Sequence, residues 1–314
     1  WIAAATSYST HGVPMLPFYI FYSMFGFQRI GDLAWAAGDM RSRGFLLGGT
    51  AGRTTLNGEG LQHEDGHSQI WASAVPNCIS YDPTFAFELA VVIQDGMRRM
   101  LTDQEDVYYY ITLMNENYSH PAMPKGAEQD IIKGMYRLQS MGEANNPLRV
   151  QLLGSGTIFR EVISAAEMLH TEWGIASDLW GCPSMNELGR DWNETNRSNL
   201  LNPSNTPKLS HVERLLKDTK GPVIAATDYM RLFAEQIRPP IQNLGRRYEV
   251  LGTDGFGRSD TREQLRHFFE VDRRWITVAA LKALADDGKI DRKKVAEAIV
   301  KYQIDPNKPN PMKV

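Results

Sequence analysis

Short apolar segments rich in aromatic and β-branched residues alternate with amphipathic segments along the whole chain. Segments of the first kind predict strands and those of the second kind predict helices. This alternation is typical of an α/β protein in which a parallel sheet carries helices on both faces. The predicted strands are Phe18–Tyr22 (a buried one), Phe45–Gly48, Cys78–Asp82, Val107–Leu113, Val150–Leu153, Ala176–Trp180, Pro222–Ala226 and Tyr248–Leu251. The predicted helices lie near residues 1–9, 23–43, 68–74, 84–101, 158–170, 228–236, 261–268, 271–286 and 292–302.

The alternation is interrupted once, at residues 115–127. This segment has two prolines, few apolar residues and no periodicity, which is typical of a linker. A chain of 314 residues is long enough for about two domains. We therefore expect two parallel-sheet domains, residues 1–122 and residues 123–314.

The chain opens with Trp1-Ile-Ala-Ala-Ala, which predicts a helix without a capping residue and without the features of a signal peptide. We therefore expect this chain to be the C-terminal piece of a longer protein.

Charge and cysteine content exclude several classes of protein. The 34 Lys and Arg residues nearly balance the 37 Asp and Glu residues, so there is no broad basic surface for nucleic acid or anionic membrane. The longest apolar stretch, Met15–Phe27, is shorter than the ~20 residues of a membrane-spanning helix. Cys78 and Cys182 are far apart, which excludes a disulfide framework and a cysteine-based zinc site. We expect a soluble cytoplasmic protein.

Residues 63–67 read His-Glu-Asp-Gly-His and match the H-E-x-x-H zinc signature. That motif needs a helix to bring both histidines to one face, and the neighbouring glycines Gly58, Gly60 and Gly66 disfavour a helix here. We therefore expect no metal site. Two alternatives remain: a merely hydrophilic loop, or an active-site loop, since several titratable side chains on one loop are typical of active sites.

Two other glycine motifs follow predicted strands. Gly154-Ser-Gly156 begins like a dinucleotide-binding turn, but Phe159 stands where the third glycine belongs, so a plain strand-to-helix turn is favoured. The segment 252–262 could be an anion-facing loop or a structural turn at a domain or subunit interface.

The aromatic run Tyr19–Phe27 is also open to two interpretations. Residues of this kind are mostly buried in cores. Alternatively, Tyr22 and Phe25 could present a stacking surface for a flat ring.

Three segments together resemble the homodimeric pyruvate dehydrogenase E1 family, which belongs to the transketolase-like thiamine diphosphate superfamily. They are Phe18–Asp32 (FYIFYSMFGFQRIGD), Gly52–His67 (GRTTLNGEGLQHEDGH) and Leu251–Asp260 (LGTDGFGRSD). The resemblance implies that the chain holds the back half of a pyrimidine-binding domain followed by the C-terminal domain. It also implies that the glutamate that activates the cofactor and the ligands for diphosphate and Mg²⁺ precede Trp1.

The resemblance implies a function for five residues. Phe25 corresponds to the aromatic residue that packs against the pyrimidine ring of thiamine diphosphate, with Tyr22 and Arg29 as polar groups beside it. His63 corresponds to the histidine that contacts the substrate-derived group, and Glu59 to its acidic neighbour. A positioned imidazole suits the decarboxylation of a 2-oxo acid. Negative charge develops on oxygen and carbon in this reaction, and an imidazole can stabilise that charge or protonate the atom that carries it. No function is implied for His67.

For the parent protein, the resemblance implies a homodimer that decarboxylates pyruvate and acetylates the lipoyl group of an E2 partner. The alternatives are that the present chain is a non-catalytic assembly module, or a zinc hydrolase that uses residues 63–67. Because the glycine-rich loop 48–67 is charged and has little packing of its own, we expect a second chain or a missing domain to order it.

Overall fold

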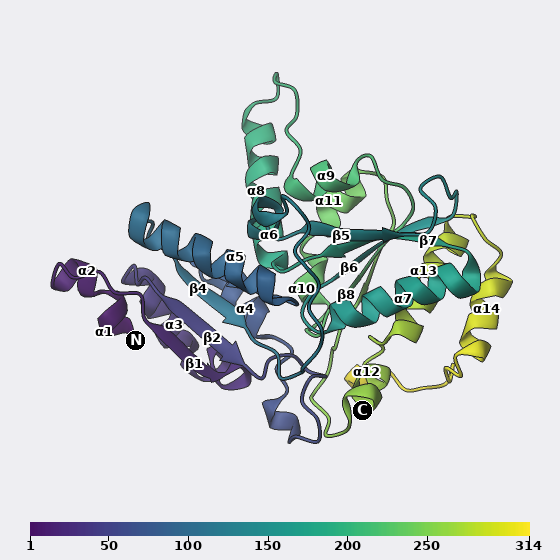
Figure 1. Cartoon of the computed structure of the whole chain (residues 1–314), viewed down its shortest axis with the longest axis horizontal. Helices are drawn as coiled ribbons and strands as arrows, with labels where there is room; N and C mark the ends of the chain where they lie inside the picture. Colours follow the sequence, from purple (N-terminus) through teal and green to yellow (C-terminus); the bar gives the residue numbers. More distant parts are fainter.

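The computed structural model describes all 314 residues and contains two β-sheets, each surrounded by helices (Figure 1). The first sheet has four strands in the order β1-β2-β4-β3, and the second has five in the order β5-β7-β6-β8-β9. The strands of the first sheet are β1 Phe18–Tyr22, β2 Phe45–Gly49, β3 Cys78–Tyr81 and β4 Tyr108–Thr112. Those of the second are β5 Tyr136–Met141, β6 Arg149–Gly154, β7 Ala176–Gly181, β8 Val223–Ala226 and β9 Tyr248–Leu251. The predicted α/β class is confirmed.

The helices connect these strands. In the first half they are α1 Ile2–Ala5, α2 Ser7–Thr10, η1 Ser23–Phe25, α3 Phe27–Asp39, η2 Leu61–His63, α4 Ser68–Ala74, α5 Ala86–Met97 and η3 Arg98–Thr102. In the second half they are α6 Glu128–Ile132, α7 Ile158–Trp173, α8 Met185–Leu201, α9 His211–Leu216, α10 Leu232–Glu235, α11 Arg238–Asn243, α12 Arg262–Phe268, α13 Arg273–Asp286, α14 Arg292–Lys301 and η4 Pro311–Lys313. No helix is both long and apolar enough to cross a membrane.

Both faces of the first sheet are covered over β2 and β4. Alternate residues of β2 point to opposite faces, so Phe45 and Leu47 belong to one buried cluster and Leu46 to another. The first cluster includes Val92 of α5, whereas the second includes Ala34 of α3 and residues of α4. This arrangement explains why β2 is apolar at every position that lies under a helix.

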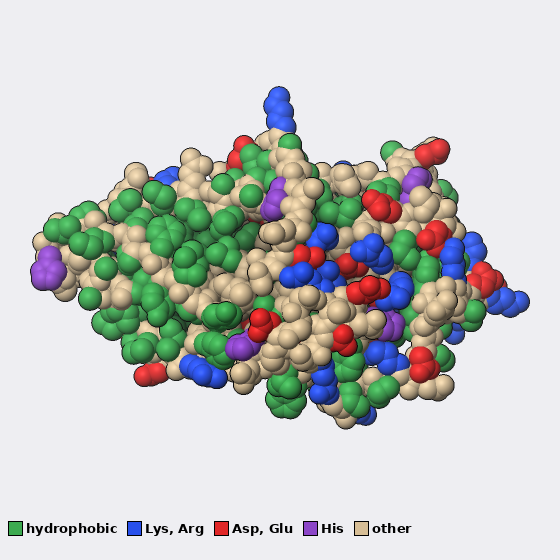
Figure 2. All heavy atoms as spheres, turned by 60° about the horizontal axis from the view of Figure 1, so that its bottom comes forward, with side chains coloured by type: hydrophobic (Ala, Val, Ile, Leu, Met, Phe, Trp, Pro, Cys, Tyr) green, Lys and Arg blue, Asp and Glu red, His purple; other side chains and the backbone are tan.

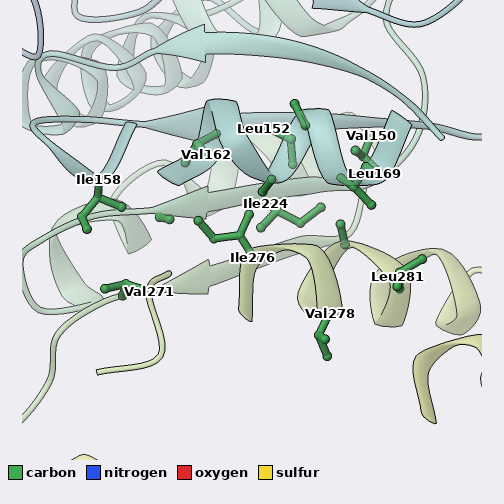
Figure 3. Packing of buried hydrophobic residues seen from close by; sticks show 14 of the residues in the cluster. Val150, Leu152, Ile158, Val162, Leu169, Ile224, Val271, Ile276, Val278 and Leu281 are labelled. Carbon is green, nitrogen blue, oxygen red and sulfur yellow. The ribbon is translucent and has the colours of Figure 1, made fainter. Parts of the chain in front are cut away.

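The second sheet shows the same pattern. Figure 3 shows Val150 and Leu152 of β6 and Ile224 of β8 packed against residues of α7 and α13. Leu153 and Val223 point the other way, into a cluster with α8 to α11. Two buried layers therefore fix the positions of the loops at the ends of these strands.

The structure corrects several sequence predictions. The second sheet is not wholly parallel, because β5 pairs antiparallel with β7. β5 was not predicted, since its residues alternate with polar side chains that face solvent. Helix α8 was not predicted because only its first turns are buried. The helix predicted at 228–236 is shorter, with α10 beginning at Leu232.

Strand β1 was predicted to be buried, and this is wrong for this chain. It is the edge strand of the first sheet, and Phe18, Tyr19, Ile20 and Tyr22 are 48%, 50%, 68% and 53% exposed. Other large apolar side chains nearby are exposed as well, from Val13, Met15, Leu33, Trp35 and Met40. Figure 2 shows hydrophobic side chains gathered over the half of the molecule that contains β1 and α3. We name this set of residues the apolar face.

The two sheets meet near the carboxyl ends of their strands. Asp82, directly after β3, accepts hydrogen bonds from Thr112 at the end of β4 (2.7 Å) and from Ser155 after β6 (2.8 Å). Tyr229, after β8, donates a third at 3.3 Å. Residues 115–127 contain no helix or strand. The domain boundary near residue 122 stays a prediction. We call the part of the chain built on the first sheet the first domain and the part built on the second sheet the second domain.

Candidate active site

Tyr22, Phe25 and His63 form a cluster of three rings. Tyr22 ends β1, Phe25 lies in the short helix η1 that follows, and His63 ends η2. The His63 ring lies 5.8 Å from the Tyr22 ring and 5.3 Å from the Phe25 ring, which it meets edge-on at 79°. The Tyr22 and Phe25 rings are 6.0 Å apart. The fold thus brings together residues about 40 positions apart in the sequence.

Two charged side chains complete this cluster. The guanidinium of Arg29 lies over the Phe25 ring at 4.4 Å from its centre, a cation–π contact. The Glu59 carboxylate lies 3.4 Å from Nδ1 of His63. That nitrogen is buried and makes no hydrogen bond, and Glu59 is half-exposed. All five residues predicted for the site therefore lie together, and we refer to them as the His63 cluster.

Residues 63–67 do not form the helix that the zinc signature requires. Only Leu61–His63 is helical, and α4 begins at Ser68. Between them, the Asp65 carboxylate caps α4 by accepting the backbone N–H groups of His67 (3.0 Å) and Ser68 (2.9 Å). His67 hydrogen-bonds Gln28 and packs on Trp71. No group of three His, Cys, Asp or Glu side chains is placed to hold a metal.

The second domain holds the amino-terminal part of loop 48–67. The backbone N–H of Arg53 donates to the main-chain carbonyl of Asp228 at 3.2 Å, and that of Thr54 donates to the Asp228 carboxylate at 3.1 and 3.2 Å. Arg262 donates to the carbonyl of Thr55 at 2.6 Å. Residues 51–56 are buried as a result.

The carboxyl-terminal part of the loop is held by the same domain. The carbonyl of Gly66 accepts the N–H of Met230 at 2.7 Å, and the Glu64 carboxylate accepts the N–H of Arg258 at 2.7 Å. A Cβ on Gly257 would collide with the carbonyl of Leu61. The packing of segment 252–262 against the loop agrees with its interpretation as a structural turn at an interface. Contacts within this chain therefore hold both ends of the loop, whereas residues 57–61 at its tip are exposed. That a second chain or a missing domain orders the tip stays a prediction.

Four carboxyl groups in and around this interface have raised pKa values because they are buried. Burial raises the pKa of Asp82, Glu88 and Asp228 to about 7, although hydrogen bonds or the nearby Arg266 oppose this. Burial raises the pKa of Glu64 to about 8, opposed by the Arg258 N–H and by Arg53. Sequence patterns did not identify Asp82, Asp228 or Arg53, because their partners are distant in the sequence.

The turn Gly154-Ser-Gly156 lies at the position where open α/β sheets bind ligands, since β7 and β8 flank β6 on opposite sides. In this chain Asp82 of the first domain lies at that position and accepts a hydrogen bond from Ser155. A Cβ on Gly154 would lie 2.9 Å from the ring of Phe159. The interpretation of this segment as a plain strand-to-helix turn agrees with this packing.

Two family models match the chain: "Pyruvate dehydrogenase E1 component middle domain" at residues 1–121 and "Transketolase-like TK C-terminal domain" at residues 134–272. The pyruvate dehydrogenase E1 component of Cupriavidus necator is 72% identical over 314 residues, which is 100% of this chain and 35% of that protein. The corresponding Escherichia coli K12 protein is 57% identical over 312 residues, which is 99% of this chain and 34% of that protein. The chain thus spans about a third of the length of these relatives.

Solved structures show the same fold at lower identity. The transketolase of Campylobacter jejuni matches with a TM-score of 0.67 at 17% identity, over 90% of this chain and 38% of that one. A split-gene transketolase in an inactive β4 tetramer matches with a TM-score of 0.63 at 16% identity, over 90% of this chain and 80% of that one. The identity to the E1 components extends over the whole chain, and we conclude that this chain belongs to the pyruvate dehydrogenase E1 family, as the C-terminal portion of its members.

Proposed function

We propose that this chain carries the substrate-facing residues of a thiamine-diphosphate-dependent pyruvate dehydrogenase E1 enzyme. The observation that carries the proposal is the His63 cluster, in which an imidazole, two aromatic rings, a carboxylate and a guanidinium converge from two separate segments. The identity of 52–72% to E1 components over the whole chain supports it.

The residues of the cluster fit one side of thiamine diphosphate. Phe25 is partly exposed and Tyr22 is half-exposed, so both rings can contact a flat pyrimidine ring. Arg29 covers Phe25 and adds a positive charge beside it. We place the groups that hold the diphosphate and Mg²⁺ outside these 314 residues, in the remaining two thirds of a protein of the relatives' length.

Thiamine diphosphate, when bound, would supply a cationic ring that can take up the electron pair of the pyruvate C–C bond that breaks. In this scheme Glu59 orients His63 through Nδ1, and the opposite ring nitrogen, Nε2, faces the substrate oxygen and exchanges a proton with it. Tyr22 and Phe25 exclude water from that side of the reacting atoms.

Overall, pyruvate loses CO₂ and its acetyl group passes to the lipoyl disulfide of an E2 partner. The disulfide S–S bond breaks, one sulfur becomes an acetyl thioester and the other takes up a proton as a thiol. We also propose that the working enzyme is a homodimer. The apolar face supports an assembly, because exposed apolar patches of this kind are typical of interaction surfaces.

The test is an assay of pyruvate-dependent acetylation of a lipoyl domain, with thiamine diphosphate and Mg²⁺. We expect a full-length protein to be active and the isolated 314-residue chain, which holds only part of the site, to be inactive. Turnover by the isolated chain would contradict this division of the site. One equivalent of tightly bound zinc that is lost in His63→Ala would contradict the proposed function itself.

A further inference from the structure

The loop that carries Glu59 and His63 depends on the second domain for its position. The loop is glycine-rich, and Asn57–Leu61 at its tip are exposed. Within the tip, the N–H of Gly58 donates to the carbonyl of Asp260 in the second domain at 2.9 Å. Loops with little packing of their own hold a side chain accurately only if other groups fix their backbone.

Asp228 makes the most concentrated contact of this kind. It lies two residues after β8 and is fully buried. Its main-chain carbonyl accepts the N–H of Arg53, and both of its carboxylate oxygens face the N–H of Thr54. The carbonyl and carboxylate of one residue thus hold two consecutive backbone amides of the loop.

The carboxylate of Asp228 accepts no hydrogen bond from a residue of its own domain, and both of its contacts go to Thr54. No cationic side chain lies within ion-pair distance of it, although the nearby Arg266 favours its charged form and lowers its pKa. Burial of a carboxyl group is unfavourable. A hydrophobic side chain of similar size would fill such a position at lower cost. What the carboxyl group adds is the pair of contacts to the backbone of Thr54.

We propose that Asp228 is a positioning residue of the second domain, which acts through the backbone of Thr54 to hold Glu59 and His63 in place for the reaction. The proposal rests on the proposed function, because it needs His63 to act on the substrate. Asp228 itself is not proposed to contact substrate or cofactor. Its effect on the reaction is therefore expected to pass entirely through His63.

The test is a double-mutant cycle in the full-length protein, with Asp228→Ala, His63→Ala and the double variant. We expect Asp228→Ala to lower kcat at least about tenfold, because small displacements of a catalytic group are costly. We expect it to leave the affinity for thiamine diphosphate unchanged. In the His63→Ala background the same substitution should change kcat by less than about twofold.

Two further variants separate positioning from general destabilisation. Asp228→Asn keeps an oxygen acceptor for the Thr54 N–H, and we expect it to restore part of the kcat that Asp228→Ala loses. Glu88→Ala removes another buried carboxyl group, one that accepts the Tyr136 hydroxyl at 2.6 Å and whose other hydrogen bonds come from the N–H groups of Thr84 and Phe85, outside the loop. If Glu88→Ala lowers kcat, it should do so by the same factor in the wild-type protein and in the His63→Ala protein.

The outcomes are distinguishable. If Asp228→Ala lowers kcat by the same factor with and without His63, Asp228 has only a structural effect and the proposal is wrong. If His63→Ala alone leaves kcat unchanged, the proposed function of the His63 cluster is wrong, whatever the effect of Asp228→Ala. Hydrogen exchange adds a second readout: we expect the amides of residues 54–63 to exchange faster in Asp228→Ala, whereas unchanged protection would overturn the proposal.

Discussion

The carboxylate of Asp228 lies 3.1 and 3.2 Å from the backbone nitrogen of Thr54, and this contact joins the second domain to the loop that bears His63. Thr54 lies in the loop after β2 of the first sheet and Asp228 in the loop after β8 of the second, and the two residues are far apart in the sequence. The contact makes the geometry of the His63 cluster a property of both domains. Substitutions well away from His63 can therefore change its position.

The substitution Gly52→Ala tests how tightly the contact between Asp228 and Thr54 is packed. The φ of Gly52 is +87°, and an added Cβ would collide with the Asp228 carboxylate. We expect Gly52→Ala to lower the free energy of unfolding by about 3 kcal/mol, from left-handed backbone strain plus overpacking. Gly58 is the matched control, because its φ is +73° and nothing lies near its Cβ position. Gly58→Ala should cost only about 1 kcal/mol. Equal losses in urea unfolding would contradict the packing described here.

The buried carboxyl groups predict how stability changes with pH. Asp82 and Asp228 have an ordinary pKa of 3.8 and a folded-state pKa of about 7, so between these values the folded state binds more protons than the unfolded state. Their stabilising contribution is present at low pH and is lost as the pH rises towards 7. We expect these two groups to lower the free energy of unfolding from pH 5 to pH 7, by at most about 1.4 kcal/mol per pH unit for each group. Burial lowers the pKa of His67 and His211, which acts in the opposite direction.

Thermal unfolding at several pH values checks this expectation. Asp82→Asn and Asp228→Asn should each flatten the decline in Tm, because an amide does not titrate. Glu297→Gln, a substitution at an exposed position on α14, should leave the slope unchanged. The same dependence of Tm on pH in the wild type and in both Asn variants would contradict the raised pKa values.

Much of the fold was predictable because strand and helix periodicities follow directly from burial. The β2 and β4 segments are apolar on both faces and were identified within a residue or two. β5 and α8 were not, since each is only partly buried and so has a weak apolar pattern. The exposure of β1 could not be predicted, because an aromatic strand has the same sequence pattern whether or not another part of the protein covers it.

The site was predictable only in part. The residues of the His63 cluster were expected from resemblance to the E1 family, and the structure brings them together. Their functions stay predictions. The contribution of Asp228 could not be read from the sequence, because an aspartate after a strand is ordinary and its partner at Thr54 lies in the other domain.

The substitution Phe25→Ala tests the proposed contact between Phe25 and thiamine diphosphate. We expect Phe25→Ala in the full-length protein to weaken thiamine diphosphate binding by about 0.5–1.5 kcal/mol beyond the loss of buried area, the usual range for aromatic stacking. Phe256→Ala is the control, because that ring is 80% exposed and lies outside the His63 cluster. Calorimetric titration with the cofactor measures both. An unchanged affinity in a folded Phe25→Ala protein would show that Phe25 only fills space.

His63→Ala in the full-length protein tests whether His63 acts on the substrate. His67→Ala is the control, since His67 hydrogen-bonds Gln28 and lies outside the His63 cluster. The measurement is kcat for pyruvate-dependent lipoyl acetylation, together with the Kd of thiamine diphosphate. We expect His63→Ala to lower kcat by about 10²–10⁴-fold, the usual range for loss of a general acid or base, with little change in Kd. An intact kcat at saturating cofactor, with a weakened Kd, would contradict this expectation.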